Sequence, residues 1–373
     1  MALEAPTNPR LRKRDTALRT SADRLKTSYT MWSLFRNCRK AAWWRYIEKL
    51  VPLERDRNLR FGSLIHECLE LWHKGQGLPL GLALDGNDGR LAAVLSHVDA
   101  SCPRRAHDDE QRRTWHLATA MMKGYAATYP VEAFEVVALE MPFEGEITSP
   151  MTGAASRSFV MTGKIDGLVK QDGKYYLFES KTAATIDASY LEKLWTDFQI
   201  ILYAHYVEQT MGIRVAGVIY NILTKAKQQQ SAGETEDEFQ ARRAELIAKS
   251  KTGKSSAKRR MPETDDEFQE RLAEKFAEPM TFHRELIYLS RERFDELRGE
   301  LWELTQAFLD ARRRGVWYQN TSYCFQFGKP CPYYALCRSG GNTNVRENFY
   351  RSTDEGHGPA NDAEPVTTAI DAA

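Results

Sequence analysis

The stretch Gly163–Lys181 reads GKIDGLVKQDGKYYLFESK, and it decides the fold of this chain. Its centre, Asp172-Gly173, is a strong signal for a two-residue turn between paired strands. The residues on either side alternate between apolar and polar, as they do in strands with one buried face. The sequence therefore predicts an antiparallel hairpin built from the strands Ser158–Lys170 and Lys174–Lys181.

Two carboxylates lie close together in this hairpin. A ladder continued from the turn places Asp166 directly opposite Glu179, and Lys164 opposite Lys181. Like charges in directly opposed positions repel each other, so positive charge is expected between the acids. Either the lysines neutralise them in a salt-bridged surface, or a divalent cation binds there. Magnesium takes one or two protein carboxylates and leaves room for water and phosphate, which suits hydrolysis of a phosphodiester.

Three further side chains could complete such a site. His66, in GSLIHE, lies near the start of a predicted helix, and helical spacing puts Glu70 and His73 on the same side. The alternative for His66 is a structural role at the helix start. Gln199 and Tyr203 share one face of the apolar helix that follows the hairpin, where a buried glutamine needs a hydrogen-bonding partner. A phosphate, a water or the lysine would serve, and so would nearby backbone.

Four cysteines form a second candidate site. Three crowd into CFQFGKPCPYYALC near the end of the chain, and one lies in FRNCRKAAWWRY near the start. Four thiolates suit either zinc or an iron–sulfur cluster, and the wide spacing favours the cluster. Unligated core cysteines are the alternative. The predicted ligands are Cys38, Cys324, Cys331 and Cys337, whereas Cys68 and Cys102 are predicted to be packing residues.

Composition sets the outer limits. The chain has 373 residues, enough for one large domain or two ordinary ones, with 52 basic against 51 acidic side chains. This balance gives no sign of a nucleic-acid partner, which would need a local basic patch. No apolar run reaches membrane-spanning length, and the beginning of the sequence has no signal-peptide core. We therefore expect a cytoplasmic protein that has no membrane partner.

The predicted elements indicate an α/β fold, a mixed central sheet flanked by helices. Two more strands are predicted besides the hairpin, Phe134–Phe143 and Val215–Leu223. Helices are predicted at Thr30–Ile47, Ser63–His73, Gln111–Tyr129 and Ser189–Met211.

An internal repeat marks an insertion. ETEDEF at Glu234–Phe239 recurs as ETDDEF at Glu263–Phe268, each opening with a Thr-x-x-Glu capping box. We expect a helical pair that is either simply solvated or contacts DNA through its basic linker. The predicted domains are a flexible basic arm (1–27), a core (28–225 and 281–339), this helical insertion (226–280) and a disordered tail (340–373).

The motifs GSLIHE, GKIDGL, ESK and QIILY, with one early and three late cysteines, resemble the PD-(D/E)xK nucleases of the RecB-like branch. Within that branch the chain is most similar to the iron–sulfur forms, the CRISPR-adaptation nucleases and the AddB-type recombination nuclease domain. The resemblance spans about Thr30 to Cys337. Each motif is weak alone, but their order is specific. One departure is Ile165 where the family name has proline, a variation common in the branch.

The resemblance implies a restriction-endonuclease-like fold whose N- and C-terminal segments are joined by a [4Fe–4S] cluster held by the four cysteines. It implies that His66, Asp166, Glu179 and the carbonyl of Ser180 bind Mg²⁺ or Mn²⁺. Lys181 would position or activate the attacking water. The resemblance further assigns Gln199 and Tyr203 to organising the site and the DNA strand, with Glu140 assisting.

The predicted function is a metal-dependent DNA exonuclease that acts on single-stranded ends in recombination, repair or phage replication. Aromatic residues interleaved with basic ones in FRNCRKAAWWRY could stack on bases, or could pack beneath the cluster. Two alternatives are a non-catalytic DNA-binding or assembly subunit and a zinc-binding DNA-interaction protein. The expected partners are DNA, proteins of recombination or CRISPR adaptation, and a second copy of the chain.

Overall fold

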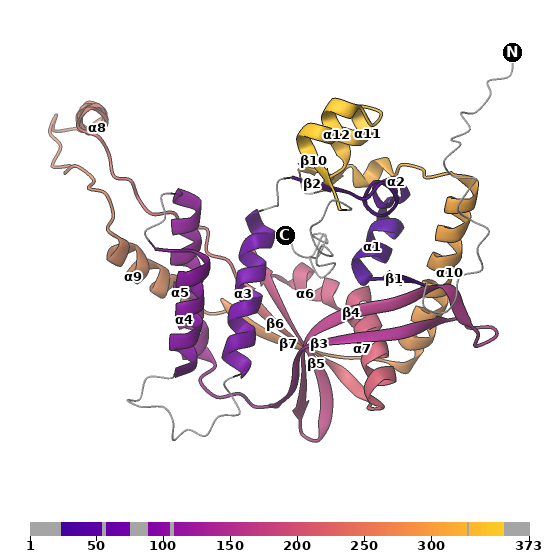
Figure 1. Ribbon diagram of the computed structural model, residues 1–373. Helices are drawn as coiled ribbons and strands as arrows, with labels where there is room; N and C mark the ends of the chain where they lie inside the picture. The colour runs from indigo at the N-terminus through magenta and orange to yellow at the C-terminus, as the bar shows by residue number, and fades with distance from the viewer. Residues whose placement is uncertain (1–23, 54–56, 75–88, 105–107, 327, 354–373) are drawn as a thin grey trace, which may run out of the picture.

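The structure, a computed structural model, describes residues 24–53, 57–74, 89–104, 108–326 and 328–353. A twisted mixed sheet runs through the middle of the molecule, with helices on both sides of it (Figure 1). The strands follow the order β1-β4-β5-β6-β7, and β3 pairs with β4 as well. Their bounds are β1 Leu25–Thr27, β3 Glu135–Thr148, β4 Ala155–Gln171, β5 Lys174–Ala183, β6 Val215–Thr224 and β7 Phe282–Tyr288. The predicted mixed α/β class is confirmed.

The β4–β5 hairpin forms as predicted around Asp172-Gly173, both of which have positive φ. Its ladder runs from Gln171–Lys174 to Gly167–Phe178 and stops one residue before Asp166. Beyond that point the edge of β4 pairs in parallel with β1, at Phe159–Met161. The sheet is therefore open beside β4 between these two ladders.

The opening has a local cause. It also means that the predicted ladder does not continue past Gly167. The backbone N–H of Ser180 donates to the Asp166 carboxylate at 2.9 Å, a side-chain bond where the ladder would continue. Lys164 consequently does not face Lys181 in a ladder, and it pairs with Glu140 on β3. A polar side chain has replaced a backbone partner, and the strands separate at the acidic residue.

The helices form two apolar cores on either side of this opening. In one core, α1, α7 and α10 pack beside β3 and β4; in the other, α3, α4, α5 and α9 pack together (Figure 1). The helix bounds are α1 Tyr29–Asn37, α3 Arg57–Lys74, α4 Gly89–Ser101, α5 Asp109–Thr128, α7 Phe198–Met211, α9 Asp265–Phe276 and α10 Arg291–Arg314.

Two predicted helices are interrupted. The first breaks at Cys38, whose backbone is extended, into α1 and α2 (Arg39–Ala42), followed by a π-helical turn at Trp43–Ile47. The second breaks before Asp197 into α6 (Ala188–Leu194) and α7. The first break places Cys38 at a helix end, and the second places Gln199 in the first turn of α7.

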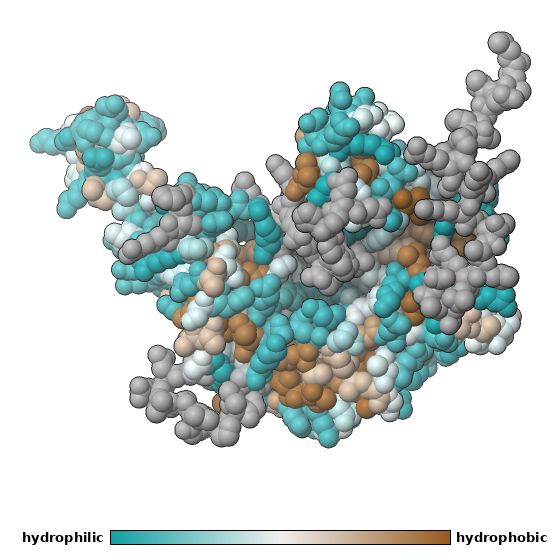
Figure 2. All heavy atoms as spheres, in the orientation of Figure 1, coloured by the Kyte–Doolittle hydropathy of each residue, from teal (hydrophilic) through white to brown (hydrophobic). Residues whose placement is uncertain are grey.

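The two helices of the predicted insertion have different surroundings. α8 (Glu236–Lys249) has no buried residue and stands away from the body on a hydrophilic lobe, residues 227–264 (Figures 1 and 2). α9 buries Phe268, Leu272 and Phe276 in the second core, beside α5. Both predicted capping boxes are present. The inserted segment is thus one projecting helix and one core helix.

The lobe is held together by reciprocal contacts between the two copies of the repeat. Glu234 accepts a bidentate hydrogen bond from Arg242 (2.8 and 2.6 Å) and another from the backbone N–H of Arg260 (2.7 Å). In the second copy, Glu263 takes the same bond from Arg271 (2.8 Å twice) and accepts the N–H of Ser231 (2.9 Å). Each glutamate thus binds the residue three places before the other glutamate, so the contacts have approximate twofold symmetry.

The ends of the described chain are more ordered than predicted. β1 lies within the predicted flexible arm, and α12 (Thr343–Phe349) and β10 (Tyr350–Ser352) lie within the predicted tail. β10 pairs with β2 (Leu50–Pro52), which joins the late segment to the early one. The remainder of both predictions, 1–23 and 354–373, lies outside the described residues. Among the described helices, none has the length and apolarity that a bilayer crossing requires.

Candidate active site

The two predicted carboxylates meet where the sheet opens. Asp166 comes from β4, and Glu179, Ser180 and Lys181 come from β5. Lys181 Nζ lies 2.9 Å from Glu179 Oε1, and both side chains are nearly buried. An acid and a lysine two residues apart share one face of a strand, as the sequence predicted.

His66 reaches this acidic pair from α3. Its Nδ1 lies 3.2 Å from Asp166 Oδ2, and 34 % of its side chain is exposed. Burial opposes protonation of the imidazole, but the negative charge of Asp166 outweighs it, and the pKa of His66 rises to about 9. Without a bound cation, His66 therefore carries positive charge that balances the carboxylates.

The two acids have opposite pKa shifts. Burial, reinforced by the negative charge of Asp166, raises the pKa of Glu179 to about 7. Burial also disfavours the charged form of Asp166, but His66 and the Ser180 N–H hold its pKa below the ordinary value. This divergence is expected when two carboxylates share one buried site. Asp166 is the permanent anion, and Glu179 is the acid whose charge depends on its surroundings.

The helix α7 supplies the predicted polar pair. Gln199 Oε1 accepts a hydrogen bond from Lys181 Nζ at 3.1 Å, so the half-buried glutamine has the lysine as its partner. Tyr203 lies one turn further on, and burial together with the charge of Glu179 raises its pKa strongly. Asp197, which the sequence analysis missed, caps α7 by accepting the Gln199 N–H at 2.9 Å and also accepts from the Tyr220 hydroxyl at 3.1 Å. An aspartate directly before an apolar helical run was the available signal.

Glu140 lies beside Asp166 on the neighbouring strand. The residues on either side of it, Leu139 and Met141, pair with the residues on either side of Asp166. Glu140 has a φ of 47°, a left-handed conformation that is rare for glutamate, and it forms an ion pair with Lys164. Backbone strain of this kind concentrates at functional sites.

Two side chains that share the predicted helical side with His66 have other partners. Glu70 forms an ion pair with Lys74 on α3. His73 is buried among other elements, where its Nε2 lies 3.2 Å from the Tyr125 hydroxyl. Helical spacing alone therefore overestimated the extent of the site at His73, whereas the charge of Glu70 still acts on Glu140 and Lys164.

The donor set suits a hard divalent cation in type. The hydrogen bond and the ion pair of Asp166 fall on Oδ2, and the ion pair of Glu179 falls on Oε1, so each carboxylate has a second oxygen to offer to a cation. Two carboxylate oxygens and the Ser180 carbonyl are the ligands that magnesium and manganese prefer. In the described part of the chain, no three His, Cys, Asp or Glu side chains already form a closed ion-binding group. Here the acids are paired with His66 and Lys181 instead.

The four predicted cysteines lie near one another at the junction of the early and late segments. Cys38 is at the α1–α2 break, and Cys337 is in α11 (Tyr334–Arg338). Burial and the nearby Cys38, Cys337 and Cys324 sulfurs raise the pKa of Cys331 to about 12. Each sulfur accepts one N–H bond: Cys38 from Asn320 N (3.4 Å), Cys324 from Gln319 Nε2 (3.2 Å), Cys331 from Tyr333 N (3.5 Å) and Cys337 from Trp44 Nε1 (3.4 Å).

The aromatic residues of the early segment pack around these cysteines. Trp44 is buried and holds Cys337, while Lys40 stacks on Trp43 and Trp44 at 3.7 and 4.8 Å from the ring centres. Arg39 stacks similarly on Tyr318, at 4.7 Å. These basic groups are engaged with rings of the chain itself, which favours the packing interpretation over base stacking.

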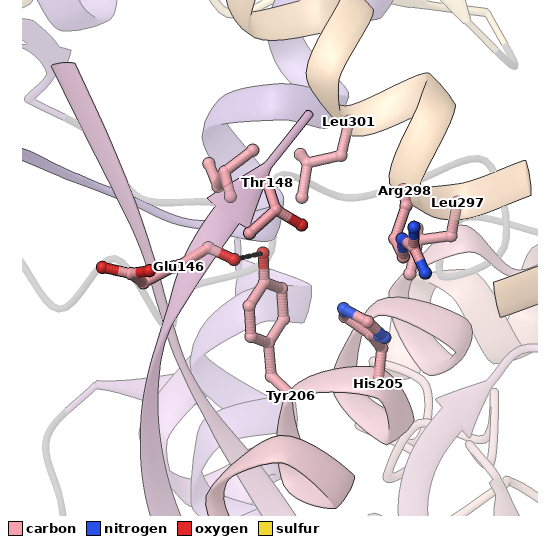
Figure 3. Close-up of a pocket in the computed structure, with 8 residues that line it drawn as sticks. Glu146, Thr148, His205, Tyr206, Leu297, Arg298 and Leu301 are labelled. Atoms are coloured by element: carbon pink, nitrogen blue, oxygen red, sulfur yellow. Dashed lines mark hydrogen bonds between the residues drawn. The ribbon is translucent and has the colours of Figure 1, made fainter. Parts of the chain in front are cut away.

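A separate small pocket lies between β3, α7 and α10 (Figure 3). Tyr206 points into it and donates a hydrogen bond to the Glu146 carbonyl at 3.3 Å. Its volume of about 10 Å³ is that of a single water molecule, and it holds none of the predicted site residues. It is therefore a packing defect rather than a candidate active site.

An acidic pair with a lysine, placed where a mixed sheet opens, is suited to phosphodiester hydrolysis with a divalent cation. The chain belongs to the PD-(D/E)XK nuclease superfamily, whose family model matches residues 26–338. Among solved structures, it is similar to a protein from Eubacterium rectale named "Putative exonuclease". The sequence identity is 10 % and the TM-score 0.41, covering 86 % of this chain and 95 % of that chain. No curated protein matches this sequence.

Proposed function

We propose that this protein is a Mg²⁺- or Mn²⁺-dependent deoxyribonuclease, an exonuclease that acts on single-stranded ends in recombination, repair or phage replication. The observation that carries the proposal is the meeting of Asp166, Glu179 and Lys181 at the opening of the sheet, with His66 facing Asp166. His66, Asp166, Glu179 and the Ser180 carbonyl would hold the cation. A divalent cation there supplies charge that acidifies water and stabilises negative charge on phosphate.

The remaining side chains orient and balance this site. Lys181 is held by Glu179 and Gln199, so its ammonium group is fixed beside the carboxylates, where it can donate to a phosphate oxygen or an attacking water. Gln199 is fixed in turn because Asp197 caps its helix. As a ligand, His66 would have to be neutral, since only the neutral imidazole binds metal.

The direct test is degradation of labelled single-stranded DNA with Mg²⁺ or Mn²⁺. We expect Asp166→Asn and Lys181→Ala each to reduce the rate by at least about 100-fold, a typical loss when one charge-stabilising group is removed. Asp172→Asn, which removes an exposed carboxylate at the hairpin turn, is the matched control and should cleave normally. Cleavage that survives both site substitutions would exclude this site as the catalytic centre.

The same assay distinguishes an exonuclease from the alternatives. Substrates with free ends and with blocked ends are compared under one metal condition. Loss of cleavage on blocked ends supports the exonuclease. If wild type binds DNA but cleaves neither substrate with either metal, the chain is the non-catalytic subunit considered above.

For the cysteines we propose a [4Fe–4S] cluster held by Cys38, Cys324, Cys331 and Cys337. Four sulfurs from both ends of the described chain, each with one N–H donor, support it, because hydrogen bonds to sulfur are a usual feature of such clusters. Anaerobic purification should give a brown protein with stoichiometric iron and sulfide. A colourless protein that contains zinc would show instead that the four cysteines bind zinc.

A further inference from the structure

A groove of about 610 Å³ lies at the base of the lobe, separate from the small pocket beside Tyr206. It is lined by the segments that follow β5 and β6, by the end of α9, and by the turn that leads into β7. Its volume falls within the range of about 300–1,000 Å³ that is usual for ligand sites. None of the residues assigned to the nuclease site lines it.

The groove begins where the carboxylate site ends. β5 and β6 are parallel, so their carboxyl ends lie at the same edge of the sheet. Lys225, which follows β6, donates its N–H to the Ala183 carbonyl at 2.7 Å, and Ala183 is only two residues beyond Lys181. The first groove residue after β5, Ala184, is therefore three residues beyond Lys181 along the chain.

The charge of the groove suits a phosphate backbone. Lys225, Lys227 and Lys275 line it, against a single acid, Glu278, which forms an ion pair with Lys275. Thr185, which follows β5, also lines the groove. Lysine and threonine side chains are common phosphate contacts in proteins that bind nucleic acids.

Gln228 supplies a second, independent observation. It lines the same groove, and its Oε1 is buried without a hydrogen-bond partner among the described residues. Buried acceptors in native proteins nearly always have a partner, so such an atom needs an explanation. A donor on the edge of an unpaired base would satisfy it.

We propose that this groove binds the nucleotides next to the scissile phosphate, as a single strand. Lys225 and Lys227 contact the phosphates, and Gln228 accepts a hydrogen bond from a base. The Watson–Crick edges of a duplex are already paired, so a Gln228 contact to that edge of a base selects single-stranded DNA. This inference rests on the proposed nuclease function, since it takes the strand to be the substrate.

The test is binding of a labelled single-stranded oligonucleotide to the full chain, measured by fluorescence anisotropy with a chelator present to prevent cleavage. On single strands the logarithm of affinity falls with the logarithm of salt by about 0.7 for each phosphate contact. Lys225→Ala combined with Lys227→Ala should therefore reduce this slope by about 1.4. Lys170→Ala combined with Lys174→Ala, at the far end of the β4–β5 hairpin, is the matched control and should leave it unchanged.

Gln228→Leu tests the base contact separately. We expect about tenfold weaker binding to a normal oligonucleotide and no change with an abasic one, which lacks the donor. A salt slope that is unchanged in the groove double variant, or reduced equally in the control, overturns the proposal. So does an equal effect of Gln228→Leu on both oligonucleotides.

Because this binding is measured without cleavage, the two proposals can fail separately. If the groove variants reduce the salt slope as expected but the Asp166→Asn protein still cleaves DNA, the groove proposal stands and the assigned catalytic site is refuted. If cleavage depends on Asp166 but the salt slope does not change in the Lys225 and Lys227 variant, the catalytic site stands and the groove proposal is refuted.

Discussion

Two histidines on α3 show how strongly a residue depends on its partners. His66 faces Asp166 and its pKa rises to about 9. His73 lies two turns further on, where burial and the positive charges of Arg284 and Arg90 lower its pKa to about 3. The sequence placed both on one side of a helix and could go no further. The charges that separate them come from other elements of the fold.

His73 makes a testable contribution to stability. Its pKa is 6.5 in the unfolded chain and about 3 when folded, so the unfolded state binds the extra proton. Stability is therefore fully present above pH 6.5 and is lost as pH falls toward 3, by about 1.4 kcal/mol per unit. From pH 7 to pH 5, the free energy of unfolding measured in urea should fall by about 2 kcal/mol more for wild type than for His73→Gln. The control is His97→Gln, at a half-buried histidine that pairs with Glu67. Equal losses in wild type and His73→Gln would contradict the assignment.

At the scale of elements, α7 links its own cap to Lys181, the lysine that we propose to be catalytic. Asp197 accepts the Gln199 N–H, and Gln199 accepts from Lys181. Asp197→Ala should cost about 1 kcal/mol of stability, the usual value of a helix cap, and also reduce the cleavage rate because Gln199 moves. Asp187→Ala, at the cap of α6, should cost similar stability and leave the rate unchanged. Equal effects of both changes on the rate would show that Asp197 acts through stability alone.

Two glycines test the packing of the sheet and of α10. A Cβ on Gly217, in β6, would lie 2.3 Å from the Ile287 carbonyl of β7, whereas one on Gly299, in α10, meets nothing within 4 Å. Gly217→Ala should destabilise the protein by about 1–3 kcal/mol because backbone must move. Gly299→Ala should stabilise it by up to about 1 kcal/mol, since alanine favours a helix. Thermal unfolding of the pair checks both signs, and a neutral Gly217→Ala would refute the close approach.

Elements were predictable where their signals are local. The turn residues Asp172-Gly173 specified the hairpin, and both capping boxes marked helix starts correctly. The end of the ladder was not predictable, because it depends on the Asp166 side chain taking the Ser180 N–H. Nor could the repeat show that α9 is a core helix while α8 is exposed. The two segments share their first turn, but α9 has the buried Leu272 where α8 has Arg243, and α9 packs beside α5.

At the scale of the whole molecule, residues far apart in the sequence are joined near the cysteines. β2 pairs with β10, the Tyr333 hydroxyl donates to the Leu50 carbonyl at 3.0 Å, and Asn320 binds the sulfur of Cys38. The sequence suggested this junction from the cysteine positions alone. It could not show the strand pair, because β10 falls in a segment whose composition resembles a disordered tail.

Removing one junction cysteine should therefore affect the whole fold. Cys38→Ser is expected to lose bound iron and to lower the thermal unfolding temperature, because a site that closes a very long loop stabilises strongly. Cys68→Ser is the matched control, since Cys68 is equally buried but lies in the other core. It should retain iron whatever its effect on stability. Iron retained by Cys38→Ser would exclude Cys38 as a ligand.

The reciprocal glutamate contacts of the lobe have a consequence for its integrity. Glu234 fastens the segment before α9, and Glu263 fastens the segment before α8, so neither half keeps its shape without the other. A protease that cuts the connection between Ser250 and Ala257 would leave two fragments still clasped together. Such a nicked protein would migrate as one species under native conditions and as two only after denaturation.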